Sequence, residues 1–477
     1  MALLKPWNQH TKIVCTMGPG LTPALIERLI RAGMDVARIN RSHGTQDEAA
    51  GYIRTVRELA AKLGSNVAIL IDLHGPKYRI GELKTPSVIL KKGAQVVLTR
   101  GRILGDEKIL PINFPSLHKD VEPGKAILLD DGAMQLKVLE IRGTDIICRV
   151  VEGGILTPHR GVVVPGAKIS EPFLTAGLRK NLSFAVEQKA DYIALSFVSV
   201  AEDVLKVKAI LKRKDCQSPL ISKIERAEAV RNLDKILEVS DGLMVARGDL
   251  GVEMPLKDLP LIQKEIIWRC NIAGKAVITA TQMLESMINA ARPTRAEVSD
   301  VANAILDGTD AIMLSAETSI GKYPVQAVKT MYDIALVTEK HLRHDQILAS
   351  FEPYLENHTD ELIAYNACHT AYKLKAKAIV AVTQSGSTAR RVSRYRPSMP
   401  VIAITPNKEV LGRLVLYWGV YSFYAETPVS LEHQLDMSSK LVKKLGIAKA
   451  GDLIVITRGI PVGVAGTTNL LKVHQVP

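Results

Sequence analysis

Charged residues close two short apolar runs in the middle of the sequence. Lys223 and Glu225 end one run, and Arg247 and Asp249 follow the next. If both runs are buried strands, these side chains emerge at the same open end. One lysine and two carboxylates are suited to binding a single divalent cation together with a phosphate group.

The pair Lys223 and Glu225 has a second interpretation. Side chains two positions apart on a strand point to the same face, so the two residues could form a purely structural ion pair. The neighbouring elements must therefore show whether a site surrounds them.

Eight short apolar runs alternate with amphipathic stretches, which predicts an α/β protein built on a (β/α)₈ TIM barrel. Most runs are almost continuously apolar, as expected for parallel strands covered on both faces. The runs are Lys12–Met17, Val36–Asn40, Ala68–Asp72, Tyr192–Phe197, Leu220–Glu225, Gly242–Arg247, Ala276–Thr281 and Ala311–Glu317.

The active sites of such barrels lie at the C-terminal ends of the strands. Any one polar residue there could simply cap the next helix, which is the simpler interpretation for Thr16 or Ser196 alone. The complete set is different, because several charges are costly to bury and converge on one rim. The set is Thr16, Arg38, Asn40, Asp72, Ser196, Lys223, Glu225, Arg247, Asp249, Thr281, Ser315 and Glu317.

Two further domains interrupt or follow the barrel. Short alternating runs with turn signals fill 76–166, which predicts a small inserted β-barrel lid domain. After residue 343 strands and helices alternate again, which predicts a C-terminal α/β regulatory domain over 344–477. The barrel then comprises 1–75 and 167–343.

Composition limits the possible functions. The formal net charge is +13, but the basic residues are dispersed and aromatic residues are few, so we expect small anionic substrates and no nucleic acid. No apolar run approaches the ~20 residues that span a bilayer, so no membrane association is expected. Five scattered cysteines without metal-ligand or redox spacing indicate free thiols in the cytoplasm.

Several motifs together resemble the pyruvate kinase family over essentially the whole chain. The resemblance implies Mg²⁺-dependent (or Mn²⁺-dependent) phosphoryl transfer from phosphoenolpyruvate to ADP, giving pyruvate and ATP in glycolysis. The matching stretches are Arg38–Gly44, Asp72–Lys77, Ser222–Glu225, Met244–Gly251, Ala280–Met287, Arg292–Glu297 and Met313–Thr318.

The resemblance also implies roles for individual residues. Glu225 and Asp249 would hold the divalent metal, and Lys223 would neutralise charge on the phosphoryl group and the enolate. Arg38 and Arg79 would grip phosphate. Thr281 and Ser315 would lie near the enolate carbon, where a proton is delivered. The remaining substrate contacts, at the carboxylate, would come from the backbone of Ala246, Arg247, Gly248 and Asp249.

The monovalent-cation site departs from the common pattern. Many members bind K⁺ through side chains matching Asn40, Ser42 and Asp72 and a carbonyl matching Leu73, with a nearby glutamate that is Lys77 here. An ammonium group could supply the charge of K⁺, so we expect a K⁺-independent enzyme. The alternative is that Lys77 is only a solvated hinge residue.

The nucleotide site departs more. Thr16, Pro19, Asn40 and His43 match nucleotide-binding positions. Other positions that are polar or basic in many members are altered, so we expect modest ADP affinity or loose nucleotide preference, unless Arg41 or a lid residue compensates. These altered positions are Val163, Ser170, Val200 and Ile320.

The C-terminal domain contains a loop of small residues between a predicted strand and a basic helix. Free N–H groups at a helix start favour phosphate, and in the family this loop binds sugar-phosphate effectors. We therefore expect a sugar-phosphate or nucleotide effector, and the resemblance further implies a homotetramer. The predicted contacts are Thr383, Ser385, Gly386, Ser387 and Thr388.

Two other functions remain open from the sequence. A related metal-dependent 2-oxo acid lyase shares the barrel and the enolate chemistry but lacks a lid, so the insertion disfavours it. A catalytically weak regulatory homologue is favoured only by the altered nucleotide positions. ATP formation in a coupled assay separates these from an active kinase.

Overall fold

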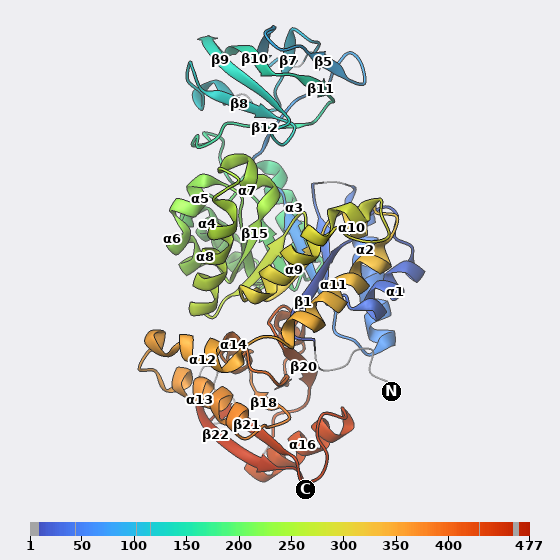
Figure 1. The fold of residues 1–477 in the computed structure, drawn as a ribbon, viewed down its shortest axis with the longest axis vertical. Coiled ribbons are helices and arrows are strands. Elements are labelled where there is room, and N and C mark those ends of the chain that lie inside the picture. Colours follow the sequence, from blue (N-terminus) through green and yellow to red (C-terminus); the bar gives the residue numbers. More distant parts are fainter. Residues whose placement is uncertain (1–8, 43, 102, 115, 429, 461–466) are drawn as a thin grey trace.

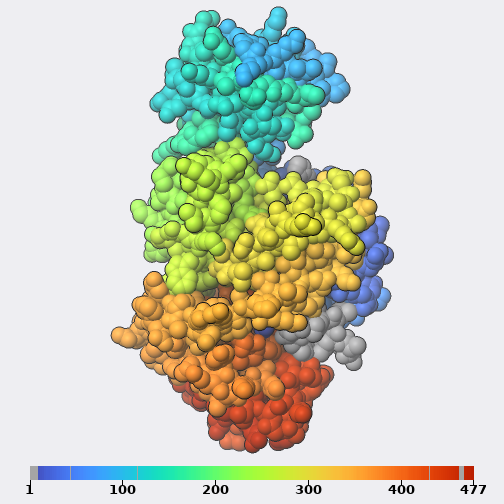
Figure 2. Space-filling view, in the orientation of Figure 1, coloured from blue at the N-terminus to red at the C-terminus, as the bar shows by residue number. Residues whose placement is uncertain are grey.

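Three bodies lie in a row along the long axis of the molecule, with the barrel in the middle (Figure 1). The computed structural model describes residues 9–42, 44–101, 103–114, 116–428, 430–460 and 467–477. The space-filling view shows the lid above the green part of the barrel, while the yellow part of the rim is uncovered in this view (Figure 2).

Within the described residues, eight parallel strands close into a barrel in the order β1-β2-β3-β13-β14-β15-β16-β17. This confirms the predicted fold class. The strands are β1 (Lys12–Thr16), β2 (Val36–Asn40), β3 (Ala68–Leu73), β13 (Tyr192–Leu195), β14 (Leu220–Ile224), β15 (Gly242–Ala246), β16 (Ala276–Ala280) and β17 (Ala311–Leu314). Several end before the predicted run does, because the charged residues already belong to the loops.

Helices cover the outside of the barrel. Typical capping residues begin several of them; Thr45, for example, forms a complete capping box with Glu48. The helices are α1 (Pro23–Ala32), α2 (Gln46–Leu63), α3 (Ala176–Glu187), α4 (Ala201–Arg213), α5 (Ala227–Arg231), α6 (Leu233–Val239), α7 (Arg247–Glu253), α8 (Leu259–Ile272), α9 (Arg295–Leu306), α10 (Ala316–Ser319) and α11 (Pro324–Glu339).

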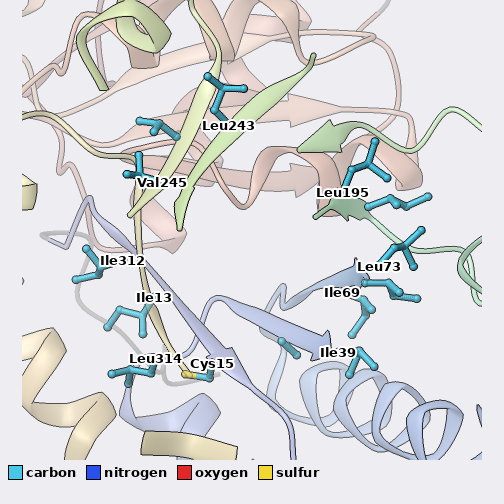
Figure 3. Close-up of a cluster of buried hydrophobic side chains, with 14 of the residues drawn as sticks. Ile13, Cys15, Ile39, Ile69, Leu73, Leu195, Leu243, Val245, Ile312 and Leu314 are labelled. Carbon is cyan, nitrogen blue, oxygen red and sulfur yellow. The ribbon is translucent and has the colours of Figure 1, made fainter. Parts of the chain in front are cut away.

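Each barrel strand has one face toward the helices and one toward the interior. Ile13, Leu73 and Leu243 belong to the cluster that packs under the helices (Figure 3). Ile221 belongs instead to the cluster that includes the barrel interior. Lys223 is two residues beyond Ile221, so it continues the inward-facing row upward to the rim. Alternation along the strand therefore places this lysine at the mouth.

The lid, inserted between β3 and α3, contains a curled seven-stranded sheet and a separate two-stranded sheet. The turn between β8 and β9 has Asp130, Asp131 and Gly132 at positive φ, a conformation that Asp and Gly adopt more readily than most residues. The strands are β4 (Tyr78–Arg79), β5 (Val88–Leu90), β6 (Gln95–Thr99), β7 (Ile109–Pro111), β8 (Ala126–Leu129), β9 (Met134–Arg142), β10 (Asp145–Glu152), β11 (Gly154–Leu156) and β12 (Gly161–Val163).

The C-terminal domain has a five-stranded sheet in the order β20-β19-β18-β21-β22. The last strand is antiparallel and was missed from the sequence, because its polar residues, such as Lys472 and His474, interrupt the apolar run. The elements are α12 (His344–Ser350), α13 (Thr359–Lys373), β18 (Ile379–Val382), α14 (Ser387–Arg394), β19 (Val401–Thr405), α15 (Lys408–Leu414), β20 (Val420–Tyr424), α16 (Leu431–Lys444), β21 (Leu453–Gly459) and β22 (Thr468–Gln475).

The predicted domain boundaries fall in connections between these elements. Residues 75 and 76 lie between β3 and β4, and 166 and 167 lie between β12 and α3, while 343 is the last residue before α12 and 344 is its first residue. We keep 1–75 with 167–343, 76–166 and 344–477 as proposed boundaries.

A buried ion pair joins the barrel to the C-terminal domain. Arg396 Nη1 lies 2.6 Å from Asp310 Oδ1, and both side chains are almost completely buried. Arg396 also donates to Asn271 Oδ1 and to the Gly308 carbonyl. Asp310 accepts from the backbone N–H groups of Val277 and Trp418. This buried charge pair therefore holds the two domains together, with Arg396 Nε the one nitrogen of the guanidinium that lacks a hydrogen-bond partner among the described residues.

A buried carboxylate at the end of α11 binds the segment that precedes β1. The Glu339 carboxylate accepts hydrogen bonds from the backbone N–H groups of His10 (2.8 Å) and Thr11 (2.6 Å). Burial raises the pKa of Glu339 to about 7, despite these hydrogen bonds. The folded protein therefore holds a proton here that the unfolded chain releases above its ordinary pKa near 4.5.

The E339Q variant tests this carboxyl group. Between pH 4.5 and 7 the folded state binds more protons than the unfolded state, so wild-type stability falls as pH rises. We expect the wild type to lose up to about 3 kcal/mol relative to E339Q from pH 4.5 to 7.5, measured by denaturant unfolding. The partly exposed Glu27 provides the control variant E27Q; because the hydrogen bond from Arg31 lowers the pKa of Glu27, its pH dependence has the opposite sign. A pH-independent difference for E339Q would contradict the expectation.

None of the described helices combines the length and apolar composition needed to cross a bilayer. The five cysteines are free thiols, and Cys216 alone among them is partly exposed.

Candidate active site

The Lys223 ammonium lies in a cluster of acceptors at the barrel mouth. Its Nζ is 2.7 Å from Glu225 Oε1 and 3.4 Å from Asp72 Oδ2, and it donates to Ser196 Oγ at 2.8 Å. Burial alone would lower the pKa of Lys223, but the carboxylates of Asp72 and Glu225 raise it above its usual value. Lys223 therefore stays a cation in the wall of the site.

Asp72 is shared by two cations. Arg38 Nη2 lies 2.7 Å from Asp72 Oδ2, and Arg38 Nε donates to the same oxygen at 2.8 Å. Burial alone would raise the pKa of Asp72, but Lys223 and Arg38 hold it below its usual value. Arg38 also donates to Thr16 Oγ1 at 3.0 Å. One carboxylate on β3 thus orients cations from β2 and β14.

Glu225 is positioned by an unusual backbone. The N–H of Phe197 donates to Glu225 Oε2 at 2.7 Å, and Phe197 has a φ of 59°, in the left-handed region. Burial, with a contribution from the charge of Asp249, raises the pKa of Glu225 despite Lys223. A further cation beside these two carboxylates would relieve that cost. Such strain at the end of β13 is typical of functional sites.

Lys77 contacts Asp249 directly. Its Nζ is 2.6 Å from Asp249 Oδ1 and 3.8 Å from Asp131 Oδ1 on the lid. The ammonium also lies 5.5 Å from the centre of the Phe197 ring. Lys77 therefore faces the site rather than solvent, which answers the alternative that it is only a solvated hinge residue.

These side chains border a cavity of about 390 Å³ between the barrel mouth and the lid. Eight of the predicted site residues border this cavity: Arg38, Asn40, Ser42, Lys77, Arg79, Lys223, Glu225 and Asp249. Its other borders are His74, Gly75, Asn113, Phe114, Ser196 and Phe197. Basic residues from two bodies and two carboxylates thus surround one space.

Four predicted residues lie in the adjoining β15 and β16 loops. The Gly248 N–H donates to Thr281 Oγ1 at 2.8 Å, and Thr281 has a φ of 68°. The Arg247 guanidinium is committed to Asp300, at 2.6 Å, and to the Thr281 carbonyl. Arg247 and Ala246 are therefore left with backbone groups for any substrate contact.

A second cavity of about 600 Å³ opens beside the first. Arg38 and Asn40 border both cavities. The second cavity contains the predicted nucleotide residues Thr16 and Pro19, and also Ser315, which the sequence grouped with the enolate site. Its remaining borders are Met17, Gly18, Ile39, Arg41, Gly44, Thr45, Glu48, Ala49, Tyr52, Ala316, Ser319 and Ile320.

Other predicted nucleotide positions lie elsewhere. His43 is outside the described residues. Of the altered positions, Ile320 borders the second cavity, while Val163 ends β12 and Val200 precedes α4. Ser170 bonds to Asp120 through its backbone N–H and its hydroxyl group.

The predicted effector loop has the shape of a helix start. Gly386 adopts a φ of 85° at the N-cap of α14, and its N–H donates to Thr383 Oγ1 at 2.9 Å. Ser385 bonds to Ser387, and Thr388 lies 2.7 Å from Thr468 on β22.

Sequence reasoning missed four residues of the first cavity or undervalued them. Asn113 Oδ1 accepts the Arg79 backbone N–H at 2.7 Å, and Phe114 lies beside it. Ser196 bonds Lys223 instead of capping a helix, and Phe197 follows it. The position of Ser196 and Phe197 at a strand end was a usable signal, whereas nothing in the lid sequence distinguished Asn113.

The carboxylates fit one divalent cation of the magnesium type. Among the described residues there is no group of three or more His, Cys, Asp and Glu side chains that could enclose a metal. Mg²⁺ does not need such a cage, because one or two carboxylates plus substrate oxygens and water complete its coordination. Glu225 and Asp249 on adjacent strand ends meet that requirement.

A (β/α)₈ barrel with this rim defines a class of enzymes that act on small phosphorylated anions with a divalent metal. Two family models, described as "Pyruvate kinase, barrel domain" and "Pyruvate kinase, alpha/beta domain", match residues 8–328 and 361–474. The chain belongs to the pyruvate kinase family, whose members transfer a phosphoryl group from phosphoenolpyruvate to ADP. This confirms the predicted family and the phosphotransferase class.

Individual relatives agree over nearly the full length. The chain is 46% identical over 473 residues to the pyruvate kinase of Geobacillus stearothermophilus, covering 98% of this chain and 81% of the relative. It is 44% identical over 471 residues to that of Clostridium acetobutylicum, covering 98% and 100%. A crystal structure of a pyruvate kinase from Cryptosporidium parvum superposes with a TM-score of 0.93 at 35% identity, covering 98% and 97%.

Proposed function

We propose that the cavity of about 390 Å³ binds phosphoenolpyruvate and a Mg²⁺ or Mn²⁺ ion held by Glu225 and Asp249. The observation that carries this proposal is that Arg38, Arg79 and Lys223 converge with these carboxylates on one space. The bound metal supplies charge neutralisation for the phosphoryl group and the enolate. The lyase alternative is not supported by the family comparisons.

The chain's own cations have distinct tasks in this proposal. Arg38 and Arg79 grip the phosphate from the barrel and the lid, and Lys223 neutralises the charge that develops between them. Arg38 borders both cavities, as a group between donor and acceptor should. Phosphoryl transfer depends chiefly on such positioning and on excluding water.

Proton delivery to the enolate involves Thr281 or Ser315 in this proposal. Thr281 Oγ1 donates to the Ala280 carbonyl at 2.6 Å, so it already participates in a hydrogen-bond chain. Ser315 Oγ is buried and has no hydrogen-bond partner among the described residues. The backbone of Ala246–Asp249 remains the proposed contact for the substrate carboxylate.

The enzyme is further proposed to need no K⁺. The support is that Lys77 places an ammonium in the cavity that Asn40 and Ser42 also border. A permanent cation on the chain would supply the field of a bound monovalent ion.

A potassium-free assay tests this proposal. Turnover with phosphoenolpyruvate, ADP and Mg²⁺ in tetramethylammonium buffer is expected to stay within about twofold of turnover with added K⁺, because Lys77 supplies the charge. A lactate dehydrogenase coupled assay measures it. The coupling enzyme is checked with pyruvate in both buffers, and strict dependence on K⁺ would contradict the expectation.

The nucleotide is proposed to bind in the cavity of about 600 Å³ bordered by Thr16, Pro19 and Asn40. His43, which lies outside the described residues, stays a predicted contact. Ile320 borders this cavity where a cation is common in the family, so fewer charged contacts reach the phosphates. We expect KM values for ADP, GDP and UDP that agree within about tenfold, because the three nucleotides share the diphosphate that the remaining charged groups would bind. Strict ADP selectivity at low KM would contradict this.

Regulation and assembly complete the proposal. A sugar-phosphate or nucleotide effector is proposed at Thr383, Ser385, Gly386, Ser387 and Thr388, supported by the left-handed Gly386 that opens α14. A homotetramer and a cytoplasmic location are proposed by analogy with the family. Turnover titrated with candidate effectors, and the mass in solution, test the first two.

A further inference from the structure

Both carboxylates of the proposed metal site already hold a lysine. Glu225 is 2.7 Å from the Lys223 ammonium, and Asp249 is 2.6 Å from the Lys77 ammonium. Lysine ammonium groups are strongly hydrated point charges, and they occupy much of the space that a metal ion needs at a carboxylate oxygen.

The two lysines are held very differently. Lys223 has Glu225, Ser196 and Asp72 as acceptors and lies on a barrel strand. Lys77 has one short contact, to Asp249, and its other carboxylate neighbour, Asp131, is 3.8 Å away and largely exposed. Lys77 also lies in the connection to the lid rather than on a barrel strand. Of the two cations, Lys77 is the one that can move.

We propose that Lys77 is a displaceable internal cation, which neutralises Asp249 until a divalent metal binds and must leave this carboxylate when it does. The proposal rests on the proposed role of Asp249 as a metal ligand. Magnesium–oxygen distances are about 2.1 Å, so an ammonium left on the same oxygen would stay within about 5 Å of the divalent ion. Repulsion at that distance, in a half-enclosed cavity, favours release of the lysine.

The structure offers the released ammonium a place to go. Asn40 and Ser42 border the same cavity as Lys77 and present carbonyl and hydroxyl acceptors. The same side chain would thus serve two positions in turn: Asp249 first, and the monovalent-cation region afterwards. Metal binding and filling of that region become one event.

Direct metal binding tests the proposal without turnover. Mn²⁺ binding to the full-length protein is measured by the loss of the free Mn²⁺ electron paramagnetic resonance signal, with no substrate present. The variant K77M removes the competing charge, and we expect its Mn²⁺ dissociation constant to fall about tenfold below that of the wild type. The Mn²⁺ dissociation constant of K77Q, whose new side chain is polar and shorter than lysine, should also fall below that of the wild type.

The lid offers a matched control. Lys84 is 2.6 Å from Asp106, the same distance as in the Lys77 pair, but it is exposed and remote from the cavity. K84M should therefore bind Mn²⁺ as the wild type does. Circular dichroism and the melting temperature establish that each variant is folded.

Equal or weaker Mn²⁺ binding in folded K77M and K77Q would overturn the proposal. Turnover of the same samples with and without K⁺ separates it from the proposed K⁺ independence. Acquired K⁺ dependence without a change in Mn²⁺ affinity would overturn this inference alone. Tighter Mn²⁺ binding without K⁺ dependence would support it and contradict the monovalent-ion role.

Discussion

Replacing Lys223 with methionine is expected to lower kcat by about 10³-fold. The ammonium is the cation held by both Glu225 and Asp72, and it faces the cavity proposed to bind phosphoenolpyruvate. Removing one preorganised donor of this kind typically costs about 10²–10³ in kcat. The coupled assay at saturating phosphoenolpyruvate measures the loss.

Stability must be separated from chemistry in this variant. K223M leaves Glu225 without its ammonium, although Asp72 keeps Arg38. The melting temperature and near-ultraviolet circular dichroism show whether the barrel still folds. K208M is the matched control, because Lys208 also pairs with a carboxylate of the barrel, Asp241 at 3.3 Å, but is half-exposed and outside the cavity. A folded K223M with kcat within tenfold of the wild type would refute the assigned role.

The largest expected loss of stability is for R396M, at about 3–5 kcal/mol. This change leaves Asp310 buried without its guanidinium, and it removes the hydrogen bonds to Asn271 and the Gly308 carbonyl. Trp418 lies 5.6 Å from Arg396, so tryptophan fluorescence during denaturant unfolding reports on this interface.

The comparison uses unfolding midpoints, since a chain of three domains need not unfold in one step. R413M is the control in the same domain. Arg413 pairs with Glu409 one helical turn away at 2.7 Å, and that glutamate is 72% exposed. Its removal should cost about 0–1 kcal/mol. Equal midpoint shifts for R396M and R413M would show that the buried pair does not stabilise the interface.

The barrel was predictable because its strands are covered on both faces. Apolar runs such as Ala68–Leu73 stand out against the amphipathic helices between them. The polar strand Thr468–Gln475 was not predictable, because its stability comes from pairing with β21 and not from its own composition. Strand ends were also placed too late, since the sequence does not show where a charged residue leaves the ladder.

The residue types of the candidate site could be predicted from the sequence, but their arrangement in space could not. Residue types at strand ends identified Lys223, Glu225 and Arg38. The grouping of Ser315 with the nucleotide side depends on how the barrel closes between β1 and β17, which no local pattern encodes. The contact of Lys77 with Asp249 spans 172 positions and also required the fold. The left-handed backbone conformation of Phe197 could not be predicted from the residue types around it.

The residues that border the cavity of about 390 Å³ come from two parts of the chain, the lid and the barrel. Arg79 and Asn113 belong to the lid, whereas Arg38, Lys223 and both proposed metal carboxylates belong to the barrel. A movement of the lid would therefore displace Arg79, the proposed phosphate contact, while Arg38 and Lys223 stay on the barrel strands. In the proposed function, the contacts to the substrate phosphate would then weaken while the two proposed metal ligands stay together. Under the proposed function, product departure and metal retention would therefore depend on different parts of the chain.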